Sequence, residues 1–328
     1  MTSPALSYIL VAPYTFDDVR TTLEYVRRQS ICDQIELILV TSASQPFIVD
    51  EPIVRDFHSV KIVPLPQITS IGMANAVGVQ HASAPVTIFG EDHAFPQPGW
   101  AQAILDAYDT DTDYAAVGPR VLNGNPGSLL SWADFLLGYG KWMNPSARGE
   151  INILPGHNSS YRREVLLTYG DRLAAFLEAE AVLHDDLRVH GHRLYLQADA
   201  TIRHVNYSRF SAWITASFYN GQVYAGTRSK NWSLAKRIVY TLGAVLIPFI
   251  RYKRCIDEIR LAPEVTTLLT RLAPILFFDF IVSSTGEMVG YALGVGKGVE
   301  VLRRYEFLRN KYVRDADKPL WTIPSGSQ

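Results

Sequence analysis

Three side chains capable of metal binding or acid–base chemistry follow one another near the end of the first hundred residues. Glu91, Asp92 and His93 come directly after an apolar run, Val86–Phe89, which predicts a buried strand. In open α/β sheets, ligands bind outside the carboxyl ends of the strands, so this tripeptide indicates a site for a metal ion or a sugar nucleotide. A charged surface turn is the alternative interpretation, and the neighbouring elements must decide between the two.

The elements around this tripeptide alternate between strand-like and helix-like patterns. Short apolar runs predict strands, and apolar residues at helical spacing predict helices. Such alternation favours an α/β fold with a mostly parallel sheet covered by helices on both faces. The predicted strands are 8–12, 35–40, 60–63, 86–89, 114–117, 193–196 and 201–204, and the predicted helices are 16–29, 72–81, 97–108 and 176–190.

Other polar residues lie where further strands end or helices begin. Pro13 and Tyr14 follow the first predicted strand, and Thr41 follows the second. A Pro-Gly turn before residue 160 is expected to place Ser159 or Ser160 as the cap of a helix. We therefore expect the ends of several elements to contribute to one ligand site.

The character of the chain changes after about residue 206. An apolar run, 238–250, is flanked by basic residues and is too short to span a bilayer, which needs about 20 apolar residues. A longer apolar region, 268–295, is interrupted by Asp279 and by Gly286-Glu287. We expect a pair of helices that lie in the membrane interface or are re-entrant in it. An ordinary helical subdomain, packed on the catalytic domain or on a second subunit, remains the alternative.

Charge separates the two parts of the 328-residue chain, although its net charge is only -1. From Arg228 onward, 16 basic residues face 9 acidic ones, whereas the remainder has 15 against 23. Because the basic residues flank apolar runs, a lipid surface is the expected anionic partner and nucleic acid is not. Two distant cysteines and the absence of a signal-peptide pattern indicate a cytoplasmic catalytic domain, peripheral or monotopic at the inner face of the cell membrane.

The order of these motifs resembles glycosyltransferase family 2, which has the GT-A fold. The similarity covers residues 6–207 and rests on the strand ends, the Ala-rich helix with Asn75, the acidic triplet followed by Pro96-Gln-Pro-Gly-Trp100, and Gly156-His-Asn-Ser-Ser-Tyr. The resemblance implies a GT-A domain over 1–207, and the apolar, basic-flanked segments described above predict a helical membrane-associating region over 208–328. It also implies an inverting transfer of a sugar from a nucleotide-sugar donor to a hydroxyl group.

The resemblance assigns the metal site to the acidic triplet, where the family usually has aspartates. Here the triplet reads Glu-Asp-His, so Glu91 and His93 become the expected ligands of a divalent ion, and Asp92 is expected to contact the ribose or to shape the loop. His204 matches a family histidine that adds a further ligand, although a half-buried strand-end imidazole would look the same. Imidazole ligands favour Mn²⁺ over Mg²⁺, which prefers oxygen ligands.

The general base also departs from the family pattern of Glu-Asp before a helix. Glu180 stands at the matching position and is expected to remove the proton of the acceptor hydroxyl. Glu178 is a competing candidate, and Asp185 a more distant one. A solvated acidic start of a helix would show the same pattern without any catalytic role.

The remaining expected contacts are implied by the same resemblance. Pro13, Tyr14, Thr41 and Asn75 would contact the nucleotide. Thr41 stands where the family often has an aspartate, so the base stays undetermined. His157 and Asn158 would contact the donor sugar or the acceptor. The expected partners are a nucleotide-sugar donor, a glycan or lipid-linked acceptor, a membrane surface and a second copy of the chain in a homo-oligomer.

Two other functions compete with this interpretation. A catalytically silent relative that serves as a membrane-bound scaffold or sugar-nucleotide binder would also carry altered site residues. A nucleotidyltransferase of similar build is disfavoured because no glycine-rich phosphate loop follows the first strand.

Overall fold

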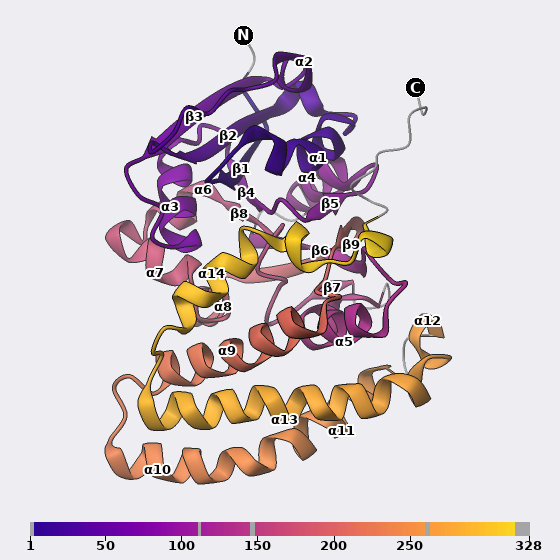
Figure 1. Cartoon of the computed structure of the whole chain (residues 1–328). Coiled ribbons are helices and arrows are strands. Elements are labelled where there is room, and N and C mark those ends of the chain that lie inside the picture. Colours follow the sequence, from indigo (N-terminus) through magenta and orange to yellow (C-terminus); the bar gives the residue numbers. More distant parts are fainter. Residues whose placement is uncertain (1–2, 111–112, 145–147, 260–262, 319–328) are drawn as a thin grey trace. The chain divides into compact units, whose positions relative to one another are not determined.

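The computed structural model describes residues 3–110, 113–144, 148–259 and 263–318 of the chain (Figure 1). Two compact units are present, and each is considered by itself. Within the described ranges, the first unit contains residues 3–124 and 148–204, and the second contains Asn125–Asn144 together with residues 205–318. Residues Asn125–Asn144 thus group with the second unit, although they precede the expected boundary after residue 207.

The first unit is built on one nine-stranded mixed sheet. Its strands run in the order β3-β2-β1-β4-β8-β6-β9-β5, and β7 pairs with β9. The strands are β1 (Leu6–Ala12), β2 (Ile35–Ser42), β3 (Ser59–Leu65), β4 (Val86–Gly90), β5 (Ala94–Pro96), β6 (Tyr114–Asn123), β7 (Gly149–Glu150), β8 (Ser160–Arg162) and β9 (Arg193–His204).

The long pairings of this sheet are parallel and the short ones antiparallel. Strands β3, β2, β1 and β4 are parallel neighbours, as are β6 and β9. Each antiparallel pairing spans only two or three residues. Every residue of β1 is buried, as expected for a central strand covered on both faces. The expected α/β class is confirmed, with a more mixed sheet than the pattern alone predicts.

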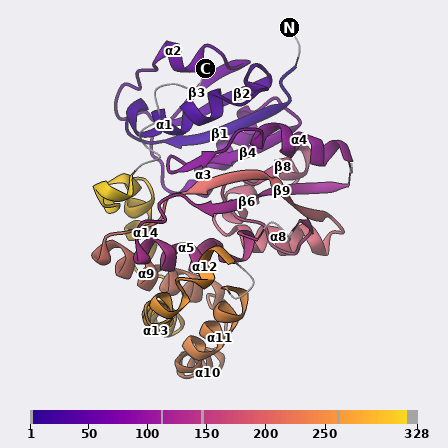
Figure 2. The ribbon, with the colours of Figure 1, turned by 90° about the vertical axis from the view of Figure 1, so that its right-hand side faces the viewer.

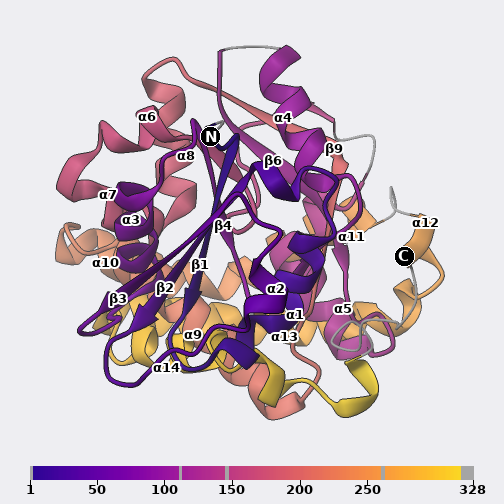
Figure 3. The same cartoon turned by 90° about the horizontal axis from the view of Figure 1, so that it is seen from above.

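Helices cover both faces of the β1–β3 part of the sheet, with α3 and α7 on one side and α1 and α2 on the other (Figure 3). A capping box between Thr15 and Asp18 begins α1, and the hydroxyl of Ser70 caps α3. The α-helices of this unit are α1 (Phe16–Arg27), α2 (Glu51–Val54), α3 (Ile71–His81), α4 (Trp100–Thr110), α6 (Arg163–Leu167), α7 (Leu173–Leu177) and α8 (Glu180–Val189).

Two local expectations are wrong in this unit. Neither Ser159 nor Ser160 caps a helix, because the first hydroxyl donates to the carbonyl of Pro155 and the second to that of Val117. Ser160 begins strand β8 instead, which inserts between β4 and β6. The expected pair of short strands near residue 200 is one continuous strand, β9, with an irregularity in its pairing to β6.

The second unit is helical. Helix α13 lies between α9 on one side and α10 and α11 on the other (Figure 2). Its α-helices are α5 (Leu129–Tyr139), α9 (Phe210–Arg228), α10 (Leu234–Gly243), α11 (Ile247–Ile259), α12 (Pro263–Thr266), α13 (Leu269–Leu293) and α14 (Gly298–Glu306). Short 3₁₀ helices complete both units: η1 (Cys32–Gln34), η2 (Gly140–Trp142), η4 (Gly170–Arg172), η5 (Ala244–Leu246), η6 (Arg309–Tyr312) and η7 (Asp315–Asp317).

The interruptions of the long apolar region do not break the helix, because α13 runs for 25 residues through Asp279 and Gly286-Glu287. Its glycine marks a close helix crossing rather than a break. A Cβ atom on Gly286 would lie 1.9 Å from the carbonyl oxygen of Phe218 on α9, and one on Gly221 of α9 would lie 2.1 Å from that of Ser283. Small residues at these positions let the two backbones approach each other directly.

Among the described residues, only α13 is long and apolar enough to cross a membrane, and 44% of its most apolar window is buried within the structure. A buried core helix would pass the same test of length and composition.

Candidate active site

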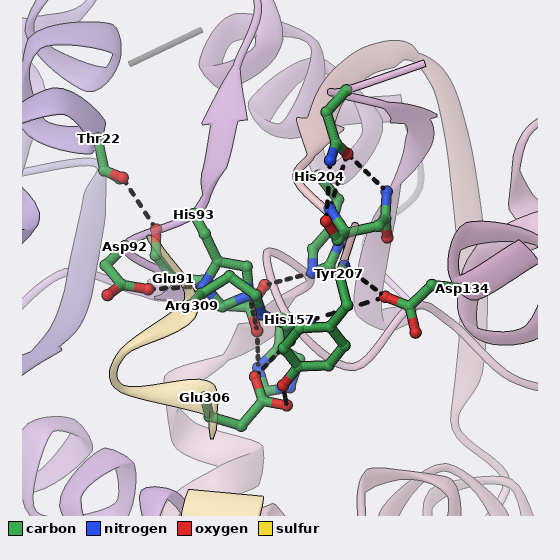
Figure 4. Close-up of polar contacts among 12 residues, drawn as sticks. Thr22, Glu91, Asp92, His93, Asp134, His157, His204, Tyr207, Glu306 and Arg309 are labelled. Carbon is green, nitrogen blue, oxygen red and sulfur yellow. Dashed lines mark hydrogen bonds and ion pairs between the residues drawn. The ribbon is translucent and has the colours of Figure 1, made fainter. Parts of the chain in front are cut away.

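The register of the sheet brings Glu91, His93 and His204 together. Glu91 follows the last residue of β4, and His93 precedes β5. Because β5 pairs antiparallel with the end of β9, Ala94 lies directly opposite His204. The rings of His93 and His204 are 4.9 Å apart between centroids, and both residues are 2% exposed (Figure 4).

These three side chains form a compact group of potential metal ligands. The Nε2 atom of His204 lies 3.5 Å from Oε2 of Glu91, and Nε2 of His93 lies 3.7 Å from Oε1. One ligand atom from each residue falls within 4.8 Å of the others, which leaves space for one ion among them. One carboxylate and two imidazoles suit a borderline divalent ion such as Mn²⁺, so the donor set fits the metal that the sequence implies.

Asp92 contacts the imidazole of its neighbour. Its Oδ1 atom lies 2.5 Å from Nδ1 of His93, on the side of the ring opposite to Glu91. A carboxylate at Nδ1 favours the tautomer that leaves Nε2 as a lone-pair donor and fixes the ring orientation. The sequence suggested a ribose contact for Asp92, and the structure adds this contact with His93.

Glu180 is the first residue of α8 and lies against the turn before β8. Gly156 has no side chain there, and a Cβ atom at that position would lie only 2.1 Å from Oε2 of Glu180. His157 joins the two parts of the site, because its Nδ1 atom lies 3.3 Å from Oε1 of Glu91 and 3.9 Å from Oε1 of Glu180. His157 therefore contacts both the group of potential metal ligands and the proposed base.

The surroundings of Glu180 raise the pKa of its carboxyl group. Burial raises the pKa of its carboxyl group, the nearby His157 opposes that rise, and the charge of Glu178 adds to it. A raised pKa makes the carboxylate a stronger proton acceptor than an exposed glutamate.

The two competing candidates for the base lie elsewhere. Oε2 of Glu178 accepts a hydrogen bond of 2.9 Å from the backbone N–H of Gly72, in the first turn of α3. Asp185 is 66% exposed and pairs with Arg188 on the same helix. Of the three acids, only Glu180 faces the His157–Glu91 pair in the described structure.

Asn158 combines burial with an unusual backbone. Its φ angle is 61°, in the left-handed region, and its backbone N–H donates to the carbonyl of Phe89 at 2.7 Å. The side chain is fully buried, yet neither amide atom has a hydrogen-bond partner among the described residues. Buried amides are normally paired, so this one is a candidate for contact with a bound ligand.

The expected nucleotide-binding residues occupy two places in the unit. Ala12 pairs with Thr41, so Pro13 and Tyr14 come off β1 beside the end of β2. Tyr14 is 39% exposed and Thr41 is buried. Asn75 is buried on α3, and its Oδ1 atom has no hydrogen-bond partner among the described residues.

Several supporting residues were missed by sequence reasoning. Tyr8 lies beside Gly90, where a Cβ atom would strike its ring, and burial together with the charges of Glu91 and Asp92 raises the pKa of its hydroxyl group. Tyr161 and His184 form a buried hydrogen bond of 2.9 Å one turn beyond Glu180. Apolar-strand and helix patterns gave no signal for these, because each looks like a core aromatic or a helix-surface residue in the sequence.

Comparison with known proteins identifies the family of this unit. The model of glycosyl transferase family 2 matches residues 14–170, which hold the metal-ligand candidates Glu91 and His93 and the turn with His157. This part of the chain belongs to glycosyltransferase family 2. Glu180 and His204 lie beyond the matched residues and join the family region through the geometry described above.

The fold agrees with that assignment. The mannosyltransferase PcManGT from Pyrobaculum calidifontis, solved with GDP-Man and Mn²⁺, matches with a TM-score of 0.56 at 13% identity, over 88% of each chain. S. aureus TarS matches with a TM-score of 0.43 at 14% identity, over 88% of this chain and 55% of TarS. That looser match adds nothing to the fold assignment. No curated protein matches the sequence.

Proposed function

We propose that the first unit is an inverting, metal-assisted glycosyltransferase that moves a sugar from a nucleotide-sugar donor to a hydroxyl group. The observation that carries this proposal is the convergence of a metal-ligand group and a buried carboxylate on His157, within a family 2 domain. The carboxylate and imidazole groups of Glu91, His93 and His204 would hold a divalent ion. When bound, that ion would neutralise charge on the leaving nucleoside diphosphate.

The chain's own residues divide the remaining work. Glu180 would take the proton from the acceptor hydroxyl, for which its raised pKa and partial burial prepare it. Asn158 would orient the donor with an amide that is already buried and fixed by its backbone. His157 lies between the base and the metal-ligand group and would be well placed to hydrogen-bond the transferred group.

A donor screen tests this proposal without knowledge of the acceptor. Thermal shift of the full chain with sugar nucleotides is expected to show stabilisation that requires Mn²⁺, because a bound donor stabilises by mass action. GDP-sugars are the first to test, since the mannosyltransferase of similar fold binds GDP-Man. Mn²⁺ is expected to act at lower concentration than Mg²⁺.

Two variants make the screen decisive. Glu91→Gln should remove the Mn²⁺-dependent shift, whereas Glu164→Gln, which changes an exposed acid of α6, should leave it unchanged. Donor binding without turnover in the presence of any hydroxyl acceptor would point to a catalytically silent binder instead. Absence of a shift with every nucleotide sugar would reject the proposal.

We also propose that the second unit holds the protein at the cytoplasmic membrane face. Helix α10 has no buried residue, and its apolar side chains are largely exposed. Leu234 is 72% exposed and Leu242 is 70% exposed. A helix of this kind, flanked by basic residues, fits the interface of an anionic bilayer, where a lipid-linked acceptor would be available.

A further inference from the structure

The second unit contains an open cavity that the transfer reaction does not use. It has a volume of about 360 Å³, which falls in the range of ligand pockets, roughly 300–1,000 Å³. Its walls come from the last turns of α9, from α10 and α11, and from the last turns of α13. The lining residues are Tyr224, Arg228, Val239, Tyr240, Gly243, Ile247, Ile250, Arg251, Arg254, Glu287 and Tyr291.

The polar side of this cavity is rich in guanidinium groups. Arg228, Arg251 and Arg254 line it together with one carboxylate, Glu287, so positive charge is in excess. Arg251 contacts Glu287 at 2.5 Å, and Nη1 of Arg228 donates to the hydroxyl of Tyr291 at 3.3 Å. These contacts hold two of the three guanidinium groups in place before any ligand arrives.

Arg254 differs from the other two. It has no ion pair or hydrogen bond with a described residue, and it is exposed while lining the cavity. Its neighbour Lys253 is 84% exposed, pairs with Asp257 at 3.8 Å, and does not line the cavity. A planar guanidinium with unused donors suits bidentate recognition of a phosphate group.

The apolar side of the cavity continues onto an exposed surface. Val239 is 66% exposed and Ile250 is 51% exposed, and both line the cavity. Around them, large apolar side chains of α10, η5 and α11 are more than half exposed: Leu234, Leu242, Val245, Leu246 and Phe249. A ligand that satisfies both sides needs an anionic head and an apolar tail.

We propose that this cavity binds the phosphate headgroup of an anionic membrane lipid while α10 and α11 enter the bilayer surface. The inference rests on the membrane association proposed above and adds a specific headgroup site to it. Tyr224 and Tyr240 line the cavity, as aromatic residues do at the headgroup level of membranes. The three arginines would contact the phosphate of the lipid, and the exposed apolar side chains would contact its acyl chains.

Vesicle flotation of the full chain tests the site. We expect tighter binding to phosphatidylcholine vesicles that contain phosphatidylglycerol than to phosphatidylcholine alone. Arg254→Gln should weaken binding to the anionic vesicles about tenfold or more, because it removes a charge-assisted hydrogen bond to phosphate. Lys253→Gln is the matched control and should cost about fivefold or less, the effect of one basic residue near an anionic surface.

Two further measurements separate the contributions. Replacing Leu242 and Leu246 with serine should weaken binding to both kinds of vesicle, because it removes exposed apolar surface while leaving the core intact. Inorganic phosphate, added without vesicles, should neither bind measurably nor stabilise the chain. Circular dichroism confirms that each variant is folded.

Several results would overturn the inference. Equal losses for Arg254→Gln and Lys253→Gln would show diffuse attraction rather than a headgroup site. Phosphate that stabilises the wild-type chain but not Arg254→Gln, with equal vesicle binding by both, would assign the cavity to a free anion. Serine variants that change the oligomeric state instead of vesicle binding would assign the apolar surface to a second copy. None of these assays involves donor or metal, so failure here leaves glycosyl transfer to its own test.

Discussion

The two units of this chain distribute polar and apolar side chains in opposite ways. In the first, apolar strands are covered on both faces, and the buried polar groups gather at the strand ends, as with Glu91 and His204. In the second, acidic groups are buried on the long central helix, whereas apolar side chains of α10 are exposed. The first arrangement gathers potential catalytic and metal-binding groups in one site, and the second exposes an apolar surface.

Removing the proposed base should have the largest effect on the site of the first unit. Glu180→Gln keeps the shape of the side chain but cannot accept a proton, so we expect turnover to fall by about 10²–10⁴-fold, with Mn²⁺-dependent donor binding retained. In the wild-type enzyme, kcat should fall as the pH drops through the raised pKa of Glu180, at a higher pH than for an ordinary glutamate.

Asp185→Asn supplies the comparison on the same helix, because Asp185 is exposed. It should leave turnover unchanged. If it abolished turnover while Glu180→Gln did not, the base would have to be reassigned.

The fold of the first unit should depend on an acid that works through its charge. Burial alone would raise the pKa of Glu36, but Lys61 and hydrogen bonds from Ser7 and Ser83 lower it to about 2. The folded state thus holds this proton less tightly than the unfolded state, so the stabilisation is complete above the ordinary pKa of 4.5 and is lost as the pH falls toward 2. We expect about 3 kcal/mol, measured by hydrogen exchange in β1–β3.

Glu36→Gln is the matched variant, because the amide keeps the size of the side chain and one hydrogen-bond acceptor but removes the negative charge. It should be less stable at neutral pH and nearly insensitive to pH below 4.5. Unchanged acid sensitivity in this variant would show that other groups govern the acid response of the sheet.

The metal site should respond more modestly to loss of the carboxylate behind His93. Asp92→Asn removes the charge next to Nδ1 but keeps a hydrogen-bonding side chain, so we expect about 10–100-fold weaker Mn²⁺ binding. Mn²⁺ electron paramagnetic resonance would measure this directly. If donor binding fell while Mn²⁺ affinity stayed constant, Asp92 would be a ribose contact alone.

The second unit should respond to pH with the opposite sign, and with the smallest effect. Burial raises the pKa of Asp134 to about 6, although Arg309 and the backbone N–H of Tyr207 lower it. The folded state holds this proton more tightly, so stability falls as the pH rises from 3.8 to about 6. The shift corresponds to about 3 kcal/mol, and because the side chain of Asp134 is 20% exposed, we expect solvent screening to reduce it to about 2 kcal/mol. Asp134→Asn should abolish this effect, measured by hydrogen exchange in α5 and α9.

The sequence predicted the fold well where side-chain periodicity decides the structure. The short, mostly apolar runs of β1 and β2 predict buried strands, and their alternation with helices indicates the α/β class. Periodicity failed at β8 and α13. Strand β8 owes its place to pairing with β4 and β6, distant in sequence, and the glycine in α13 serves a helix crossing that a single sequence does not show.

The candidate site was predictable in its residues and not in its contacts. Glu91, His93 and His204 stood out because their types suit a metal and they follow strands. That His157 lies between Glu91 and Glu180, and that Glu178 is bonded to Gly72, depends on how loops from distant elements meet. Such contacts are properties of the folded chain and leave no local signature.

The pairing of Ala94 with His204 ties the metal site to the hydrogen-bonded ladder of β5 and β9. Neighbouring strands lie about 4.8 Å apart, so this pairing brings the backbone next to His93 close to His204. His93 immediately precedes β5, so a slip of β5 by one residue would shift its imidazole along β9 by about 3.3 Å and separate the ligands, with every one of them still in the sequence. The register of β5 against β9 thus determines where the two imidazoles lie, so pairing these strands during folding also assembles the metal site.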